Sequence, residues 1–376
     1  MRSGRYDREA NQGGDVKIGI VTLCEANNYG GVLQAYALQS YLRKMGHESA
    51  ILPVDYAKRR SSPLKALERP VKTVMESVKA RKFAPFRAKH LAASGVAACR
   101  VDAFLRQPPR FDAYVCGSDQ VWNRGACADS ELRKYFFLDF GEASARRVSY
   151  AASWGAQALE PSVRDDIRAC LKKFTALSVR EKSGKAIVED LGLSALWLPD
   201  PTLLLEAAEW DRLAEDGPRP LGDNVLFQCE YRWTPCVRLP EVNRVLVRQF
   251  GWKTVIPFSD HPIRDAACTR CLTPPQWVDG IRRASLVLTN SFHGMVFSII
   301  FRRPFIAVPL AGKYAGMNER FLSLAERLGL QDRLLTEADP SRIIALAQAP
   351  IDWESVSQRL GVWRDEAHGF LADALR

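Results

Sequence analysis

The sequence predicts an α/β protein with two doubly wound, Rossmann-like domains that face a cleft. Three observations lead to this prediction. Short apolar runs alternate with amphipathic helical patterns, as in parallel sheets that are covered by helices. The alternation stops at Pro199-Asp200-Pro201 and then starts again. Polar loops follow several of the apolar runs, and ligands bind such sheets beyond the carboxyl ends of the strands.

The first domain begins with a strand-helix-strand unit. Val16–Leu23 is an apolar run typical of a strand that is buried on both faces. After the loop Asn27–Gly31, the pattern predicts a helix over Val32–Met45 that ends at Gly46, and Glu48–Val54 returns as a strand. Further strands are predicted at Ala113–Cys116, Val148–Ala152 and Leu177–Val179, with a helix over Ser162–Phe174.

The second domain repeats this alternation. Its strands are predicted at Val225–Cys229, Thr254–Phe258, Leu286–Leu288 and Phe305–Val308. Apolar residues from Trp353 to Ala374 recur at helical spacing, so the tail is predicted to be one amphipathic helix that packs back on the body. The predicted parts are a disordered arm at residues 1–15, domains at 16–199 and 200–340, and the helix at 341–376.

The composition excludes several classes of protein. The chain has 376 residues, of which 47% are hydrophobic, enough for a large core. No run reaches the ~18 apolar residues that span a bilayer. The polar arm lacks the apolar stretch of a signal peptide. Nine scattered cysteines indicate reduced thiols in a cytoplasmic protein, and the single C-x-x-C at Cys268–Cys271 has no second pair, so we expect no metal.

The net charge of +10 is concentrated in one segment, residues 56–106, which holds thirteen Lys and Arg but three Asp and Glu. Apolar residues in it, among them Val71, Val74 and Val78, follow helical spacing. We therefore expect a basic amphipathic helix or helix pair. A core-packed helix with a solvated charged face is the favoured interpretation, and contact with anionic lipid or glycan is the alternative. Nucleic acid is not expected, since no nucleic-acid motif accompanies the charge.

The most informative motif is Thr289-Asn290-Ser291-Phe292-His293-Gly294. It lies between an apolar strand and an apolar helix, where free N–H groups and partial positive charge favour an anion. His293 is a candidate general acid, because imidazole exchanges protons near neutral pH; a phosphate ligand is the alternative. Ser291 is expected to cap the helix and to donate to an anion.

Other candidates lie at strand ends. Arg180 follows an apolar run and could grip a carboxylate or phosphate bidentately, or form an ion pair with Glu181. Asp119 could take or orient a proton of a hydroxyl group, or only shape its loop, and both interpretations stay open. Lys313 could neutralise phosphate, although a solvated lysine is favoured. The remaining candidate binding residues are Asn28, Gly30, Gly31, Ser118, Gln120, Asn123, Phe292 and Gly294.

The ordered motifs resemble the polysaccharide pyruvyl transferase family. They are Asn28-Tyr29-Gly30-Gly31, Cys116-Gly117-Ser118-Asp119-Gln120-Val121-Trp122-Asn123, Ser178-Val179-Arg180-Glu181, Asp200-Pro201-Thr202, Asn290-Ser291-Phe292-His293-Gly294 and Met317-Asn318-Glu319-Arg320 with Leu328-Gly329-Leu330. The resemblance implies a GT-B-like fold. It also implies transfer of a pyruvyl group from phosphoenolpyruvate, without another cofactor, to two hydroxyls of a sugar, giving a ketal and phosphate.

The resemblance further implies the sides of the cleft and the cellular context. The first domain would bind the acceptor and the second the donor, seated on Phe292 and His293, with Arg180 on the anion. The acceptor would be a sugar or lipid-linked oligosaccharide of a bacterial cell-surface glycan, handled in the cytoplasm or at the inner face of the membrane. A nucleotide-sugar glycosyltransferase of GT-B type is the alternative, since fold alone cannot separate the two. A non-enzymatic member is disfavoured by the presence of both His293 and Arg180.

Overall fold

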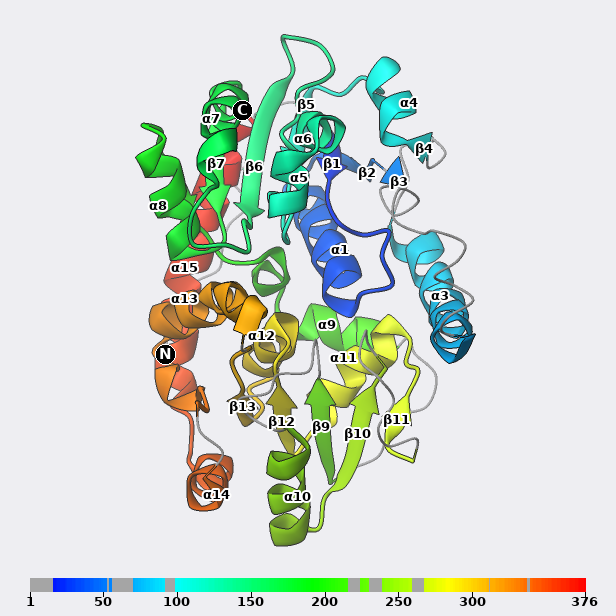
Figure 1. Ribbon diagram of the computed structural model, residues 1–376, viewed down its shortest axis with the longest axis vertical. Coiled ribbons are helices and arrows are strands. Elements are labelled where there is room, and N and C mark those ends of the chain that lie inside the picture. The colour runs from blue at the N-terminus through cyan, green and yellow to red at the C-terminus, as the bar shows by residue number, and fades with distance from the viewer. Residues whose placement is uncertain are drawn as a thin grey trace.

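The computed structural model describes residues 16–52, 54–55, 70–91, 99–215, 224–229, 239–258, 267–310, 312–336 and 339–376 (Figure 1). The arm at 1–15 and the parts of the basic segment at 56–69 and 92–98 lie outside these residues, as does the side chain of Lys313. Two main parallel sheets with helices packed around them form two domains, which confirms the predicted fold class.

The sheet of the first domain has six parallel strands in the order β2-β1-β5-β6-β7-β8. These strands are β1 (Lys17–Val21), β2 (Glu48–Ile51), β5 (Ala113–Cys116), β6 (Arg146–Ala152), β7 (Ala176–Val179) and β8 (Leu196–Trp197). The chain winds to one side of β1 and then crosses to β5 on the other side. The loops after β1 and β5 therefore flank a topological switch point, where such sheets bind ligands.

The sheet of the second domain has five strands in the order β11-β10-β9-β12-β13. They are β9 (Val225–Cys229), β10 (Lys253–Pro257), β11 (Thr269–Arg270), β12 (Leu286–Thr289) and β13 (Phe305–Ala307). Its switch point lies between β9 and β12, and the Thr289–Gly294 motif follows β12. A separate parallel pair joins β3 (Val54–Asp55) to β4 (Cys99–Arg100).

Helices connect and cover the strands. In the first domain these are α1 (Tyr29–Lys44), α3 (Pro70–His90), α4 (Val101–Arg106), α5 (Arg124–Ala128), α6 (Ser130–Phe136), α7 (Arg164–Leu171) and α8 (Lys182–Asp190), with 3-10 turns η1 (Pro161–Val163) and η2 (Pro201–Leu204). After η2 follow α9 (Ala207–Glu215), α10 (Leu239–Phe250), α11 (Pro274–Arg283), α12 (Phe292–Ile300), α13 (Glu319–Leu328), α14 (Pro340–Gln348) and α15 (Trp353–Ala374), with 3-10 turns η3 (Gly312–Asn318) and η4 (Gln331–Arg333).

Helix α1 begins earlier than its sequence pattern indicates. The predicted start was Val32, but Tyr29, Gly30 and Gly31 already form the first turn. The cause is Asn28, whose side-chain oxygen accepts a hydrogen bond from the Gly31 N–H at 3.0 Å and so caps the helix. The two glycines are thus part of a helix N-terminus, not of a loop.

One apolar core crosses the boundary between the domains. It includes Tyr29 of α1, Leu203 of η2, Trp277 of α11 and Phe297 of α12. Tyr29 stacks on Trp277 with ring centroids 5.4 Å apart, and its hydroxyl donates to the Leu272 carbonyl at 3.0 Å. The domains are therefore packed on each other beside the switch points.

Helix α15 runs along both domains (Figure 1). Its first half packs through Val356, Leu360 and Trp363 on the core shared by the domains. Its second half packs through Ala367 and Leu371 on the first sheet. The C-terminal helix thus adds a second connection between the domains.

The basic helix α3 differs from its predicted apolar stripe at Val74, whereas Val78 is half-buried and the side chains of Val71 and Met75 lie outside the described residues. Val74, a member of the predicted apolar stripe, is 61% exposed, whereas Phe83 and Phe86 are buried. Lys79 is also buried, with its ammonium 5.9 Å from the centre of the Phe83 ring. The cations of α3 are therefore not all on a solvated face, because Lys79 points into the protein.

Candidate functional site

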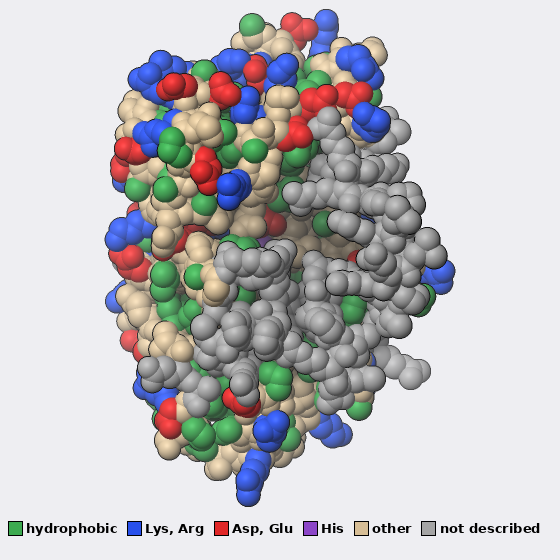
Figure 2. Space-filling view, viewed as in Figure 1, with side chains coloured by type: hydrophobic (Ala, Val, Ile, Leu, Met, Phe, Trp, Pro, Cys, Tyr) green, Lys and Arg blue, Asp and Glu red, His purple; other side chains and the backbone are tan. Residues whose placement is uncertain are grey.

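The two switch points meet where the first turns of α1 and α12 touch. A Cβ atom on Gly30 would overlap the His293 ring at Nδ1, so only glycine allows this approach. Figure 2 shows a hollow in the middle of this face, with acidic and histidine side chains visible in it. Two helix N-termini, each with partial positive charge, therefore converge at the domain boundary.

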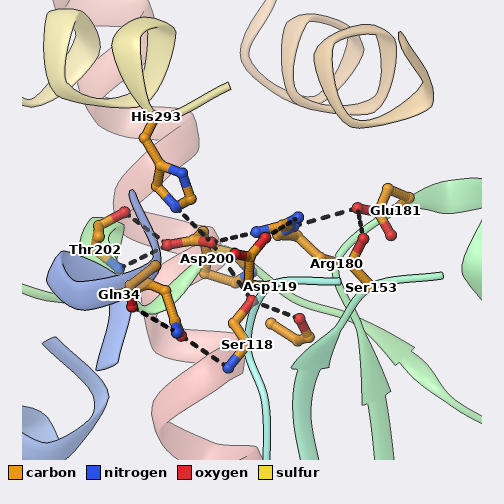
Figure 3. A network of polar contacts seen from close by, with 12 residues as sticks. Gln34, Ser118, Asp119, Ser153, Arg180, Glu181, Asp200, Thr202 and His293 are labelled. Atoms are coloured by element: carbon orange, nitrogen blue, oxygen red, sulfur yellow. Dashed lines mark hydrogen bonds and ion pairs between the residues drawn. The ribbon is translucent and has the colours of Figure 1, made fainter. Parts of the chain in front are cut away.

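Arg180 extends from the end of β7 into a group of three carboxylates (Figure 3). Its Nη1 donates to Asp200 at 2.8 Å, its Nε to Glu181 at 3.2 Å and its Nη2 to Asp119 at 3.4 Å. The guanidinium is almost fully buried. The three carboxylates differ in access: the side chains of Asp200 and Glu181 are 0% and 3% exposed, and that of Asp119 is 18% exposed.

His293 reaches the same cluster from the second domain (Figure 3). Its Nε2 lies 3.4 Å from Oδ2 of Asp200, the oxygen that also accepts from Arg180. The ring is 7% exposed, and Nε2 forms an ion-pair contact without the geometry of a hydrogen bond. Asp200 therefore lies between a cation of the first domain and an imidazole of the second.

The electrostatics of the cluster follow from burial and pairing. Burial would raise the pKa of Asp200, but attraction to His293 and Arg180 and the hydrogen bond from Thr202 outweigh it, so the pKa of Asp200 lies well below its ordinary value. Burial raises the pKa of Glu181 despite the charge of Arg180. Burial would lower the pKa of Arg180, but the three carboxylates raise it.

Buried side chains hold the loop after β5 in place. Gln34 of α1 accepts from the Ser118 N–H at 2.9 Å and donates to Thr22 at 2.6 Å. The Ser118 hydroxyl donates to the Ala151 carbonyl at 2.6 Å. Asp119, the next residue, has a φ of 64°, a left-handed conformation that is costly outside glycine and that this packing maintains.

The first turn of α12 carries no side-chain cap. Ser291 occupies the N-cap position, but its side chain makes no capping bond, so the predicted cap is wrong. Instead, Thr289 Oγ1 accepts from the Ser291 N–H at 2.9 Å. Phe292 is buried, with the guanidinium carbons of Arg180 and Arg320 at 4.5 Å and 5.9 Å from its ring centre. The helix start is thus framed by cations.

The structure gives several predicted binding residues a packing or capping position. Asn28 caps α1 and Asn123 caps α5, where it accepts from Gly125 N–H at 2.8 Å. Two predicted glycines lie in close contacts: a Cβ on Gly31 would be 2.6 Å from the Leu23 carbonyl oxygen, and one on Gly294 would overlap Thr289 Oγ1. The predicted residue Gln120 packs against Gly155, where a Cβ would be 2.6 Å from its amide nitrogen.

The structure brings His293, Arg180 and Asp119 together. It adds Asp200, which the sequence indicates only as part of the Asp200-Pro201-Thr202 motif. Its local signal was that of a helix cap, because an aspartate directly before a proline is typical of an N-cap, and Asp200 does cap η2. The sequence predicts Glu181 only as a local ion-pair partner of Arg180. Gln34 carries no sequence signal, since a glutamine in an apolar helix can serve many purposes.

Within the described part of the chain, no group of three or more His, Cys, Asp or Glu side chains is arranged to hold a metal ion. The eight described cysteines form no disulfide. No described helix has both the length and the apolar character that crossing a bilayer requires.

A protein-family comparison matches residues 28–310 to the polysaccharide pyruvyl transferase family. The chain belongs to this family, which confirms the resemblance. The matched range includes Asp119, Arg180, Asp200 and His293. Membership makes the protein a transferase and implies a sugar or glycan acceptor. A comparison with curated proteins gives no match.

Solved structures agree on the fold. The UDP-GlcNAc 2-epimerase from Neisseria meningitidis bound to UDP-GlcNAc aligns with a TM-score of 0.50 and 9% identity, over 94% of this chain and 99% of that one. A putative UDP-N-acetylglucosamine 2-epimerase from Listeria monocytogenes aligns with a TM-score of 0.51 and 11% identity, over 92% and 91%. At such identities the likeness shows a GT-B-like fold alone.

We expect Gly30→Ala to destabilise the protein. The added methyl would overlap the His293 ring, and forced overpacking of this kind costs about 1–3 kcal/mol. Gly361→Ala in α15 is the matched control, because a Cβ there meets nothing within 4 Å. Urea unfolding measures both variants. If Gly30→Ala proves as stable as Gly361→Ala, the close approach of α1 to α12 is refuted.

We expect Glu181→Gln to gain stability relative to the natural protein as pH rises. Because burial raises the pKa of Glu181, the folded state keeps a proton that an unfolded glutamate loses near pH ~4.3. The free energy of unfolding of the natural protein therefore falls as pH rises from about 4.3 to the raised pKa, a loss that the amide escapes. Urea unfolding across this pH range measures the free energy of unfolding of both proteins, and the difference between them should change in favour of Glu181→Gln as pH rises. A difference that stays constant with pH would contradict the raised pKa.

Proposed function

We propose that the protein transfers a pyruvyl group from phosphoenolpyruvate to two hydroxyls of a sugar. The observation that carries the proposal is the convergence of His293 and Arg180, from different domains, beside the uncapped N-terminus of α12. Family membership supports the reaction class. The cluster offers the three chemical functions that this donor requires: a proton source, cations for anionic groups and a partly exposed carboxylate.

The proposed reaction requires proton transfers and the binding of anionic groups. C3 of phosphoenolpyruvate gains a proton, and a sugar hydroxyl attacks C2 and loses its proton, giving a tetrahedral adduct that retains phosphate. The second hydroxyl then replaces phosphate at C2 and also loses its proton. The donor trianion and the diol thus give the carboxylate ketal and monohydrogen phosphate, with charge and atoms balanced. A positioned acid, a base and stabilisation of anionic oxygens accelerate these steps.

His293 is proposed as the acid that protonates C3. It is the second residue of α12, and its ring nitrogens face Asp200 and Gly30. The carboxylate of Asp200 is placed to stabilise an imidazolium. The N–H groups of the first turn of α12, together with the Ser291 hydroxyl, are proposed to bind the phosphate, because no side chain caps them. Lys313 is proposed to add positive charge from η3.

Arg180 is proposed to bind the second anionic group of the donor. Two of its carboxylate partners are buried, so an anion from solvent can reach the guanidinium only in the place of Asp119. The contact with Asp119 is also the longest of the three, at 3.4 Å. Once displaced, Asp119 is free to accept the proton of the attacking hydroxyl. Donor binding would therefore precede activation of the acceptor.

The acceptor is proposed to lie against the first domain, near the N-terminus of α1 and the loop after β5. We propose a cell-surface glycan, or its lipid-linked precursor, handled in the cytoplasm at the inner face of a bacterial membrane. Exposed cations of α3, such as Arg81, would support contact with anionic lipid. Flotation with vesicles that contain or lack anionic lipid tests this, and equal flotation contradicts it.

Donor binding separates this proposal from a nucleotide-sugar transferase. Phosphoenolpyruvate at about 100 times its dissociation constant should stabilise the fold by about 2.7 kcal/mol, whereas a nucleotide sugar should not. Thermal unfolding with each ligand makes the comparison. Stabilisation by the nucleotide sugar alone would favour the glycosyltransferase.

His293→Ala should lower phosphate release from phosphoenolpyruvate in the presence of acceptor by roughly 10²- to 10⁴-fold, the usual contribution of a general acid. The fold should survive, as measured by circular dichroism. His368→Ala is the matched control: this exposed histidine of α15 contacts Tyr41 away from the cluster and should leave the rate unchanged. A fully active His293→Ala enzyme would remove this residue from the mechanism.

Asp119→Asn should bind the donor more tightly yet turn over slowly. Loss of a competing, partly exposed charge should strengthen binding by roughly threefold to fivefold, while turnover falls because the base is absent. Calorimetry with phosphoenolpyruvate and phosphate-release kinetics measure the two effects.

The same Asp119→Asn substitution in an Arg180→Lys protein tests whether the tighter donor binding depends on the guanidinium of Arg180. Lysine keeps the charge but loses the fork, so donor binding should weaken and the gain from Asp119→Asn should vanish. Weaker donor binding in the Asp119→Asn single variant would show that Asp119 does not occupy the place of the donor.

A further inference from the structure

Asp200 is buried at the point where the chain leaves the first sheet. It lies between Pro199 and Pro201, forms the N-cap of η2 and is 1% exposed. The following residues enter the core that the domains share, through Leu203. Its backbone is thus fixed by two prolines and by packing, and its carboxylate cannot reach solvent.

Each oxygen of this carboxylate has a distinct set of partners. Oδ1 accepts from the Thr202 N–H at 3.1 Å and from the Thr202 hydroxyl at 2.7 Å. Oδ2 accepts from Arg180 Nη1 at 2.8 Å, lies 3.4 Å from the Ser118 hydroxyl and lies 3.4 Å from His293 Nε2. Thr202 therefore fixes the rotation of the carboxylate, and this rotation directs Oδ2 at the two groups.

The two groups depend on Oδ2 for their orientation. The His293 ring has Gly30 against Nδ1 and Asp200 at Nε2, so its plane is fixed from both sides. The guanidinium of Arg180 lies 4.5 Å from the Phe292 ring, and its Nη1 is held by Asp200, which leaves Nη2 turned toward the partly exposed Asp119. Buried partners of this kind orient the residues that contact a ligand.

We propose that Asp200 is a positioning residue for the reaction and that its carboxylate couples the two domains at the site. It does not contact the substrate. It holds the imidazole of the second domain and the guanidinium of the first at a fixed separation. This inference rests on the proposed function to the extent that His293 and Arg180 act on the substrate.

The experiment compares two substitutions with one control. Asp200→Asn keeps an oxygen for Thr202 but presents N–H groups to Arg180 and His293, which are themselves donors. Thr202→Val keeps the charge of Asp200 and removes one of the bonds that fix its rotation. Asp339→Asn is the control: Asp339 also precedes a proline and caps a helix, accepting from the Arg342 N–H at 2.7 Å, far along the chain and exposed.

Two measurements are made on each variant. The first is the ¹⁵N spectrum of the His293 ring in protein labelled at histidine; the chain has five histidines, and loss of one signal in His293→Gln assigns it. The second is phosphate release, with turnover and the Michaelis constant of the donor separated.

Asp200→Asn should shift the ¹⁵N signal of His293 and lower turnover by about 100-fold or more, since misplaced catalytic groups lose about that factor. Thr202→Val should shift the same signal and lower turnover by about tenfold, at a donor Michaelis constant within threefold of the natural value. Asp339→Asn should change neither. If Asp200→Asn does not fold, Thr202→Val decides the question by the same two measurements.

An unmoved His293 signal in the substituted protein overturns the inference, as does unchanged turnover despite a moved signal. A purely structural role would lower stability without shifting turnover at matched folded concentration. Failure of the proposed function looks different: the natural protein would not release phosphate from phosphoenolpyruvate, while the His293 signal would still respond to Asp200→Asn.

Discussion

The arrangement of this protein depends on one buried carboxylate. Asp200 is inaccessible to solvent, and a buried charge without partners costs several kcal/mol. Its partners come from both domains, Arg180 after β7 and His293 at the start of α12. Arg180 and Ser118 of the first domain already donate to this carboxylate, and His293 adds a contact from the second domain, so one buried group lies against both of the proposed chemical groups.

The backbone brings two positive helix ends to this carboxylate. Glycine at position 30 allows α1 to touch the His293 ring, and the absence of a side-chain cap leaves the first turn of α12 unneutralised. The switch points of two parallel sheets explain why both ends point to one place. A cluster with buried carboxylates on one side and helix N-termini on the other can hold a small anion and move protons beside it.

The sequence predicted the strands well, because strands buried on both faces appear as apolar runs. It missed β4, β8 and β11, which have only two residues each and are too short to be recognised from the pattern. It placed the start of α1 too late, since glycines at a helix start look like a loop until the Asn28 cap is seen. It assigned the cap of α12 to Ser291, but Thr289 holds the Ser291 N–H instead.

The candidate site was predicted by residue type and strand position, and only in part. His293, Arg180 and Asp119 do lie together, as loops at the carboxyl ends of parallel strands should. Their pairing could not be predicted: Arg180 meets Asp200 twenty positions away and His293 meets Gly30 across the domain boundary. Such contacts depend on the packing of the domains, which no local pattern encodes.

A crystal structure with phosphoenolpyruvate bound tests the account most directly. The donor should lie at the partly exposed side of the cluster beside His293, with one anionic group on Arg180 Nη2, Asp119 moved away from its present 3.4 Å contact and Asp200 unmoved. A donor bound elsewhere, with Asp119 still on Arg180, would contradict it.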